Sequence, residues 1–279
     1  MIRDFFKTIL FSLKKNKFVF APVFIIGCGR SGTTILGETL SQHPKIKYLN
    51  ERRDLWHRAY PEFNIWKKDT SNPILFADEK NIQPNKNTLL RKLFFREQVL
   101  GNAEILIEKL PINNFRLDFL QKSFPEAKYI YLTRNGLEVS KSIEKRIQKK
   151  NWFTGNKLEL LQQFSEEQNA NFIGKIETDL HKGMWEWKLS IEESNRFFKQ
   201  LNPEKFIHLS YQDFTKNPET SLNQIFDFLN ISSSKDLIST ISKKINRKNK
   251  TITVTDDKIL QEIGGEILTK TINNIYSPF

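Results

Sequence analysis

The sequence of 279 residues is poor in cysteine and histidine, and it has no long apolar run. Its single cysteine, Cys28, excludes an intrachain disulfide framework and any zinc site made of cysteines alone, and a lone thiol is typical of a reducing compartment. Four scattered histidines do not supply a zinc site either, so we expect no metal. The longest nearly apolar run, residues 18–28, is shorter than the about 20 residues that cross a bilayer. We therefore expect a cytoplasmic protein.

Glycine (11 residues) and proline (10) are also sparse, and no repeat or low-complexity linker divides the chain. At roughly 150 residues per domain the length allows two domains, but a single α/β domain with insertions fills the same length. The 38% of apolar residues, with 23 Phe, are enough for a sizeable core and exclude a disordered or collagen-like chain. We expect one domain over residues 21–279.

The N-terminal segment combines apolar residues at helical spacing with four lysines and lacks the h-region and cleavage site of a signal peptide. It predicts a basic amphipathic helix over residues 1–20 that docks on the domain. A weak contact of this helix with a membrane surface is the alternative.

Basic residues outnumber acidic ones, because 44 Lys and Arg against 32 Asp and Glu give a net charge of +12. Such a charge predicts attraction to anions without naming the anion. By itself it fits a nucleic acid, a membrane surface or an anionic small molecule.

Buried strands and helices alternate along the chain. Runs of β-branched and aromatic residues without a polar face predict strands at residues 23–28, 105–107, 128–132 and 206–209. Helical spacing predicts helices at residues 33–41, 114–122, 137–150, 158–172, 184–200 and 218–229. This alternation indicates an α/β fold with a mostly parallel central sheet flanked by helices. Ligands of such sheets bind beyond the carboxyl ends of the strands.

A glycine-rich loop follows the first strand, with the sequence GCGRSGTT over residues 27–34. It fits the phosphate-binding pattern G-x-x-x-x-G-K-[ST] except that Thr33 replaces the lysine that reaches the β- and γ-phosphates of a nucleoside triphosphate. The glycines and the helix N-terminus still suit an anion, and Arg30 adds a guanidinium inside the loop. A phosphate other than that of ATP is therefore favoured.

A second motif follows the third strand, where Arg134 ends the strand and Ser142 lies about two turns into the next helix. Together, the RSGTT loop and this Arg/Ser pair resemble the sulfotransferases that use 3′-phosphoadenosine-5′-phosphosulfate (PAPS), especially tyrosylprotein, carbohydrate and bacterial types. Weaker similarities in E-K-L-P (108–111) and Y-Q-D-F (211–214) extend the resemblance over residues 20–230.

The resemblance implies a nucleotide-kinase-like P-loop fold and the transfer of a sulfuryl group from PAPS without a metal. The 3′-phosphate would be bound by Arg134 and Ser142. The 5′-phosphosulfate would be bound by the residues of the loop, which are Arg30, Ser31, Gly32, Thr33 and Thr34.

The transfer requires a base for the acceptor and cations for the leaving phosphate. Glu51 lies one helix and a return loop after Thr34 and matches the place of a catalytic Glu in related enzymes, so it is the candidate base. An ion pair with a neighbouring arginine is its structural alternative, and His57 is the competing base. Arg30 and Lys109 are the candidate catalytic cations.

The acceptor cannot be read from the sequence: a small molecule, a glycan, a lipid or a tyrosine would present an oxygen to the same groups. We expect the irregular stretch 56–96 to form the acceptor-side wall. Two other functions stay open, a phosphoryl-transfer enzyme with a degenerate loop and a basic protein that binds nucleic acid or a membrane surface. No motif for specific nucleic-acid recognition supports the second.

Overall fold

The computed structural model describes residues 11–12, 15, 18–167, 176–245 and 257–272. Most of the predicted N-terminal helix over residues 1–20 lies outside the described residues, so that helix stays a prediction. Among the described residues, none of the helices has the length and apolar character needed to cross a membrane.

Five parallel strands of the described chain form one sheet, in the order β2-β3-β1-β4-β5. The strands are β1 (Val23–Ile26), β2 (Ile46–Asn50), β3 (Ile105–Lys109), β4 (Lys128–Thr133) and β5 (Phe206–Ser210). The four predicted strands and the parallel α/β fold are confirmed. The edge strand β2 was missed, because its polar Lys47 and Asn50 and its half-exposed middle interrupt the apolar pattern of a buried strand.

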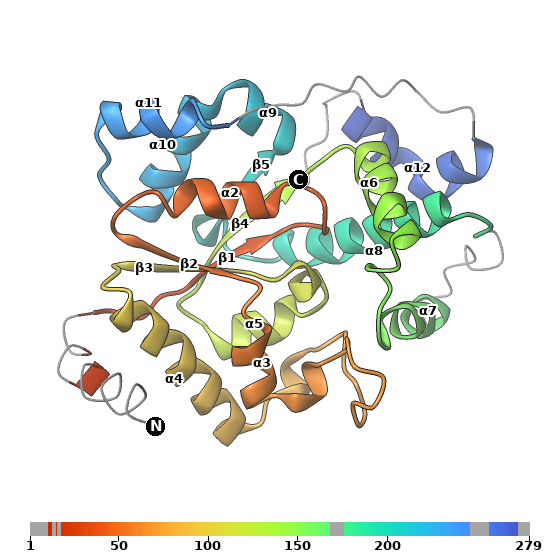
Figure 1. The fold of residues 1–279 in the computed structure, drawn as a ribbon, viewed down its shortest axis with the longest axis horizontal. Helices are drawn as coiled ribbons and strands as arrows, with labels where there is room; N and C mark the ends of the chain where they lie inside the picture. The colour runs from red at the N-terminus through yellow and green to blue at the C-terminus, as the bar shows by residue number, and fades with distance from the viewer. Residues whose placement is uncertain (1–10, 13–14, 16–17, 168–175, 246–256, 273–279) are drawn as a thin grey trace.

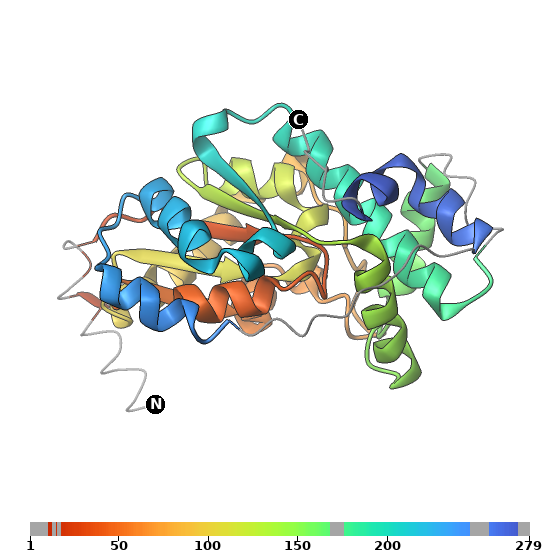
Figure 2. The same ribbon diagram turned by 90° about the horizontal axis from the view of Figure 1, so that it is seen from above.

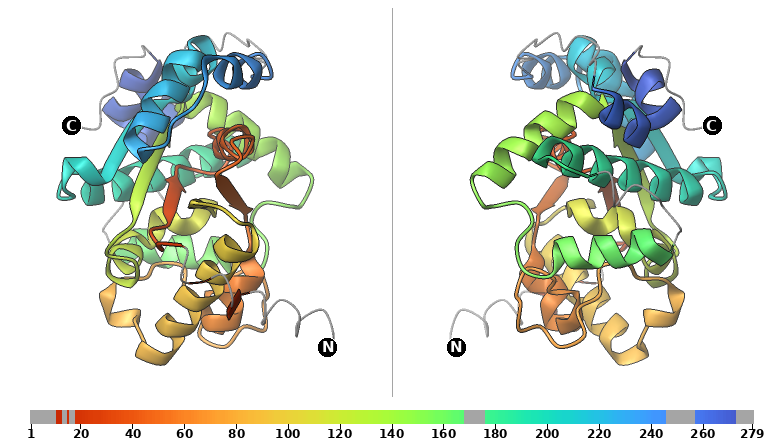
Figure 3. Two further views of the ribbon diagram at one scale, coloured as in Figure 1. Left: turned by 90° about the vertical axis from the view of Figure 1, so that its left-hand side faces the viewer. Right: turned by 90° about the vertical axis from the view of Figure 1, so that its right-hand side faces the viewer.

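Helices cover both faces of the sheet (Figures 1 and 3). One face carries α2 (Thr33–Leu40), α9 (Tyr211–Lys216), α10 (Pro218–Leu229) and α11 (Lys235–Ser242). The other face and the end of the sheet carry α3 (Arg53–Ala59), α4 (Pro84–Leu100), α5 (Leu117–Ser123), α6 (Gly136–Gln148), α7 (Lys157–Glu167), α8 (Asp179–Phe198) and α12 (Lys258–Ile272). Figure 2 shows α6, α8 and α12 gathered at one end of the molecule.

The central strand β1 is apolar throughout because both of its faces are buried. Val23 and Ile25 of β1 join the core under α2 and α10, whereas Phe24 and Ile26 join the core on the opposite face. Successive side chains of a strand point to opposite faces, so both sets must be apolar.

The expected irregularity of residues 56–96 is confirmed for residues 60–83 and wrong for the two ends of the stretch. Helices α3 and α4 occupy these ends, and the segment between them contains only short 3₁₀ turns at Pro61–Phe63 and Glu79–Asn81. Helix α4 begins with Pro84, and its Leu90, Leu93 and Phe94 face the core at helical spacing. The many Lys, Arg, Asn and Gln residues on its other face concealed this spacing.

Some predicted helix boundaries also change. The helix expected at residues 114–122 is a 3₁₀ turn, Pro111–Phe115, followed by α5. The helix expected from residue 184 begins earlier, because the Thr178 hydroxyl caps α8 by accepting the backbone N–H of His181.

The parallel register brings the carboxyl ends of the strands to one edge. Asn50 pairs with Lys109, and Thr133 pairs with Ser210. The residues that follow these positions, including Glu51 and Arg134, therefore lie at the edge where the glycine-rich loop leaves β1 (Figure 1).

Candidate active site at the carboxyl edge of the sheet

The loop of residues 27–32 leaves β1 and ends at the first residue of α2. It is anchored at its start by Asn114, whose Oδ1 accepts the N–H of Gly27 at 3.1 Å, and closed by a turn in which Ser31 N–H bonds to Cys28 O at 3.1 Å. Arg30 (φ 72°) and Gly32 (φ 97°) have left-handed backbones. Helix α2 has no acidic residue in its first turn, so its N-terminus is open to an anion.

Glycines of the loop stand where there is no room for a side chain. A Cβ atom on Gly27 would lie 2.4 Å from the carbonyl oxygen of Leu132, and one on Gly32 would lie 2.4 Å from the ring of Tyr211. The buried hydroxyl of Ser31 has no hydrogen-bond partner among the described residues. A buried hydroxyl beside a glycine loop and a helix N-terminus is suited to a phosphate or sulfate oxygen.

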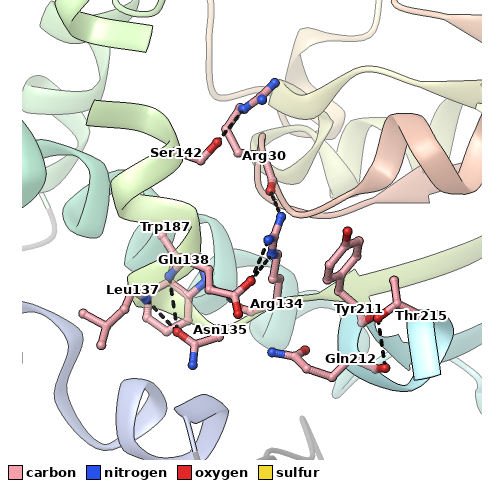
Figure 4. Close-up of polar contacts among 10 residues, drawn as sticks. All are labelled: Arg30, Arg134, Asn135, Leu137, Glu138, Ser142, Trp187, Tyr211, Gln212 and Thr215. Carbon is pink, nitrogen blue, oxygen red and sulfur yellow. Dashed lines mark hydrogen bonds and ion pairs between the residues drawn. The ribbon is translucent and has the colours of Figure 1, made fainter. Parts of the chain in front are cut away.

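The two motifs found in the sequence meet in space. Arg30 Nε donates to the Ser142 hydroxyl at 3.0 Å across a separation of 112 residues, and Arg134 Nη1 donates to the carbonyl oxygen of Arg30 at 3.0 Å (Figure 4). Ser142 is therefore one turn of α6 beyond Glu138, on the helix face toward the loop. The structure brings Arg30, Arg134 and Ser142 into one cluster.

The guanidinium of Arg134 is held on several sides. Its Nε and Nη2 donate to Oε2 of Glu138 at 2.8 and 2.5 Å, and its Cζ lies 4.2 Å from the ring centroid of Tyr211 (Figure 4). The indole N–H of Trp187 donates to the Arg134 carbonyl oxygen at 3.2 Å. The side chain is thus fixed in position before a ligand arrives.

The connection into α6 explains this placement. Asn135 caps the helix, because its Oδ1 accepts the N–H groups of Leu137 and Glu138. A Cβ on Gly136 would lie 2.9 Å from Trp187, so glycine at this position lets α6 start against α8.

Arg146 of α6, which the sequence did not indicate as a candidate site residue, lies near Arg30. Burial lowers the pKa of the Arg30 guanidinium, and the charges of Arg146 and Arg134 lower it further, so these three cations lie close together. The Nε of Arg146 is buried without a hydrogen-bond partner in the described part of the chain. Its position four residues after Ser142 was the available signal, since such residues share a helix face.

Glu51 lies directly after β2 and contacts Lys109 at the end of β3. Its Oε1 lies 2.7 Å from Lys109 Nζ, its Oε2 lies 3.0 Å from Arg53 Nη2, and its N–H donates to the Lys109 carbonyl oxygen at 2.9 Å. Glu51 has a left-handed backbone (φ 50°), which is uncommon for a residue other than glycine. Lys109 is buried, whereas 32% of the Glu51 side chain is exposed.

The surroundings keep Glu51 ionised. Burial raises the pKa of its carboxyl, but the hydrogen bond and charge of Lys109, with those of Arg53, bring the pKa below its usual range. The ion pair with a neighbouring arginine that the sequence suggested is therefore present, with Arg53, beside the pair with Lys109.

His57 lies in α3, where its ring centroid is 5.6 Å from that of Trp66. Burial lowers the pKa of its imidazole to about 4, and the charges of Arg116 and Arg53 add to this. Its Nε2 is buried with no hydrogen-bond partner among the described residues. An imidazole with this pKa is neutral at pH 7 and a weaker base than an ordinary histidine.

Next to Lys109, Glu108 is fully buried. Its carboxyl oxygens accept the indole N–H of Trp56 at 3.1 Å and the amide of Asn113 at 2.9 Å. Burial raises the pKa of the Glu108 carboxyl to about 8. The two consecutive residues of β3 thus make different contacts. Glu108 connects β3 to Trp56 of α3 and to Asn113, whereas Lys109 contacts Glu51.

A polar cavity of about 400 Å³ adjoins Arg134 at the ends of β4 and β5, and Asn135, Gln212 and Asp213 contribute to its lining. In the described residues, His, Cys, Asp and Glu form no group of three that could hold a metal ion.

Comparison with known proteins relates this arrangement to one family. Residues 22–235 match the family model described as the sulfotransferase family. Protein-tyrosine sulfotransferase A of Caenorhabditis elegans is 23% identical over 259 residues, which cover 91% of this chain and 61% of that protein. The chain spans 25% to 63% of the length of the first curated relatives it matches.

Solved structures share the fold. The sulfotransferase domain from the curacin biosynthetic pathway has a TM-score of 0.54 and 19% identity, covering 89% of this chain and 98% of that domain. A sulfotransferase from Alicyclobacillus acidocaldarius has a TM-score of 0.52 and 15% identity, covering 92% of this chain and 94% of that one. At these identities the similarity concerns the fold alone.

Proposed function

This chain belongs to the sulfotransferase family, and we propose that it transfers the sulfuryl group of PAPS to an acceptor hydroxyl or amine, with Glu51 as the base. The observation that carries the proposal is the meeting of two anion-binding motifs at one sheet edge, where Arg30 of the loop donates to Ser142 of α6. A donor with phosphates at both ends of a nucleoside requires two such groups of ligands.

The residues present fit the 5′-phosphosulfate. The buried Ser31 hydroxyl lacks a partner in the described chain, and the backbone of Gly32, Thr33 and Thr34 starts a helix without acidic residues in its first turn. Arg30 can span two oxygens of the bound anion. These residues would hold the phosphosulfate, which when bound supplies an electrophilic sulfur and a phosphate leaving group.

The second group of ligands fits the 3′-phosphate. Arg134 and Ser142 were expected there from the sequence, and Arg146 adds a third polar group on the same face of α6. The electrostatic crowding that lowers the pKa of Arg30 is relieved when an anion binds among these cations.

The proposed chemistry gives roles to Glu51, Arg30 and Lys109. In the in-line displacement, a bond forms between the acceptor oxygen or nitrogen and sulfur while the bond from sulfur to the bridging phosphate oxygen breaks. The ionised carboxylate of Glu51 takes the acceptor proton, and its exposed portion leaves it within reach of an acceptor. Arg30 and Lys109 stabilise the negative charge that develops on the leaving phosphate.

The two alternatives are less well supported. Thr33 stands where an ATP-binding loop has lysine, which speaks against phosphoryl transfer from a triphosphate. The net charge alone supports a protein that binds nucleic acid or a membrane surface, and it does not explain the glycine loop.

The acceptor is proposed only as a class, a hydroxyl or amine of a small molecule, a glycan or a lipid. The name of the Caenorhabditis elegans relative, a protein-tyrosine sulfotransferase, adds a tyrosine hydroxyl to these candidate acceptors. The cytoplasmic location and the absence of a metal remain parts of the proposal.

Binding of adenosine 3′,5′-bisphosphate (PAP) tests the donor. By calorimetry, we expect PAP to bind without Mg²⁺ and ATP with Mg²⁺ to bind much more weakly. Arg134→Ala should weaken PAP binding by about ten- to a hundredfold, since hydrogen bonds to charged groups are worth about 1.5–3 kcal/mol. Lys141→Ala, on the exposed side of α6, is the control and should bind PAP normally. Tight binding of the triphosphate alone would overturn the proposal.

A further inference from the structure

A buried ion pair lies behind the loop and takes no part in the proposed chemistry. Lys157 Nζ, at the start of α7, lies 2.6 Å from Oε1 of Glu186 in α8, and their side chains are 6% and 5% exposed. Desolvation of two charges commonly cancels their attraction, and apolar residues of similar volume would give equal or greater stability. Stability alone does not explain the pair.

Both members of the pair contact the same indole. Oε2 of Glu186 accepts the Trp152 indole N–H at 2.5 Å, and Lys157 Nζ lies 4.2 Å from the centroid of the Trp152 ring. The carboxylate fixes the edge of the indole, and the ammonium covers its face. The ring of a residue in the connection between α6 and α7 is thus held in one orientation.

The indole in turn contacts the phosphosulfate loop. A Cβ atom on Gly29 would lie 2.5 Å from Cη2 and 2.9 Å from Cζ2 of Trp152, and 3.5 Å from Cβ of Pro111. Gly29 is not among the residues with positive φ, so its backbone would accept other residues and the indole is what excludes a side chain. Trp152 therefore packs directly on the backbone between Gly27 and Arg30.

A second loop residue, Cys28, lies near the pair. The thiol of Cys28 is fully buried, and burial raises its pKa, with a further contribution from the charge of Glu186. Of two consecutive loop residues, Gly29 thus packs on Trp152, and Cys28 lies close enough to Glu186 and Lys157 to be affected by their charges. Asn114 holds the loop at its start, at Gly27, and Arg134 holds it at Arg30.

We propose that Trp152 is a positioning residue for the phosphosulfate loop, and that the buried pair Lys157–Glu186 serves to orient its indole. The inference rests on the proposed function, since PAP is the ligand whose binding reports the loop conformation. The indole keeps residues 28–30 in the binding conformation before the ligand arrives, which lowers the cost of ordering the loop.

The test separates positioning from stability. We would measure the PAP dissociation constant by calorimetry and the urea midpoint of the free protein for Trp152→Leu and for the double variant Lys157→Met/Glu186→Leu. We expect each to weaken PAP binding about tenfold. The double variant should keep or raise the urea midpoint. Combining all three substitutions should add no further loss in PAP affinity, because the residues act as one unit.

Trp185→Phe is the matched control. Trp185 is a buried neighbour of Glu186 whose indole N–H donates to Ser165 at 2.9 Å and not to Glu186. Its substitution should lower the urea midpoint and leave PAP affinity within about twofold of wild type. If Trp152→Leu fails to fold, Trp152→Phe and the double variant provide the same comparison.

The outcomes are distinguishable. Wild-type affinity for PAP in the double variant, or additive losses in the triple variant, would overturn the positioning role while leaving the proposed function intact. A wild-type protein that does not bind PAP would overturn the proposed function and, with it, this inference.

Discussion

At the scale of single residues, Glu51 combines two features that suit a base. It is ionised, because Lys109 and Arg53 lower the pKa of its carboxyl against the effect of burial, and about a third of its side chain remains accessible. It also has an unusual left-handed backbone. Residues held in such conformations occur often at active sites, and their strain is offset by the surrounding structure.

Glu51→Gln is predicted to remove turnover and spare donor binding. The amide keeps the size of the side chain but accepts no proton, so transfer from labelled PAPS should fall by about 10²–10⁴-fold while PAP affinity stays within a few fold. Glu97→Gln, which removes a carboxylate paired with Arg52, is the control and should remain active. Turnover would be followed on whichever member of an acceptor panel the wild type modifies. Retained turnover would assign the base role to His57 or to water.

Glu108→Gln is predicted to change how stability depends on pH. The folded pKa of Glu108, about 8, lies above the value of about 4.3 in an unfolded chain. Between these values the folded state holds a proton that the unfolded state has lost, so this group makes stability fall as pH rises from about 4.3 to about 8. The Gln variant lacks this loss, and its advantage over wild type should grow through that range by a few kcal/mol.

Urea unfolding of both proteins at pH 5, 7 and 9 measures this difference. An advantage of the variant that is the same at all three pH values would show that Glu108 does not titrate in this range. Because the two proteins differ only at residue 108 and both keep Lys109, the difference between their unfolding free energies reports the effect of Glu108.

At the scale of elements, α6 arranges one side of the site. Its Glu138, Ser142 and Arg146 follow one another at intervals of four residues and so share a helix face, and contacts to Arg134 and Arg30 place that face toward the loop. Lys145 is next to Arg146 in sequence but is exposed.

Arg146→Met is therefore predicted to weaken PAP binding about tenfold, because it removes a partly buried cation beside Arg30. Lys145→Met removes the same charge one position away and should change the affinity less than about twofold at 0.15 M salt. Calorimetry on both variants gives the comparison. Equal losses of PAP affinity in the two variants would show that the positive charges of α6 attract PAP without a specific contribution from Arg146.

The elements also show what could be predicted from the sequence. The buried strands were recognisable because both faces of a central strand are apolar, and the loop was recognisable because close backbone approach requires glycines. Strand β2 was not, since the polar residues Lys47 and Asn50 and the half-exposed middle of this edge strand break the pattern. The contact of Glu51 with Lys109 depends on β2 lying beside β3, and the order of strands in a sheet is set by tertiary packing.

At the scale of the whole molecule, part of the net charge of +12 is concentrated at one edge of the sheet. Arg30, Arg134 and Arg146 gather at one edge of the sheet, and Lys109 is neutralised there by Glu51. Two lysines of α6, Lys141 and Lys145, lie exposed nearby, which favours the approach of an anionic donor and predicts an affinity that falls with salt.

The two cores on opposite faces share one sheet, so we predict that they unfold together. The five tryptophans all belong to the core on the side of α3 and α8, where three are buried (Trp56, Trp185, Trp187) and two pack at its margin (Trp66, Trp152). Tryptophan fluorescence therefore reports one face, whereas far-UV circular dichroism reports the helices on both.

The two signals should give the same urea midpoint, and PAP at 100 times its dissociation constant should raise the free energy of unfolding in both by about 2.7 kcal/mol. The ligand is expected to act on both faces because its proposed binding residues come from the loop before α2 and from α6. A fluorescence transition that shifts with PAP while the remaining circular dichroism transition does not would show that the face with α2 and α10 unfolds independently of the site. The two cores on opposite faces of the sheet would then be separate cooperative units.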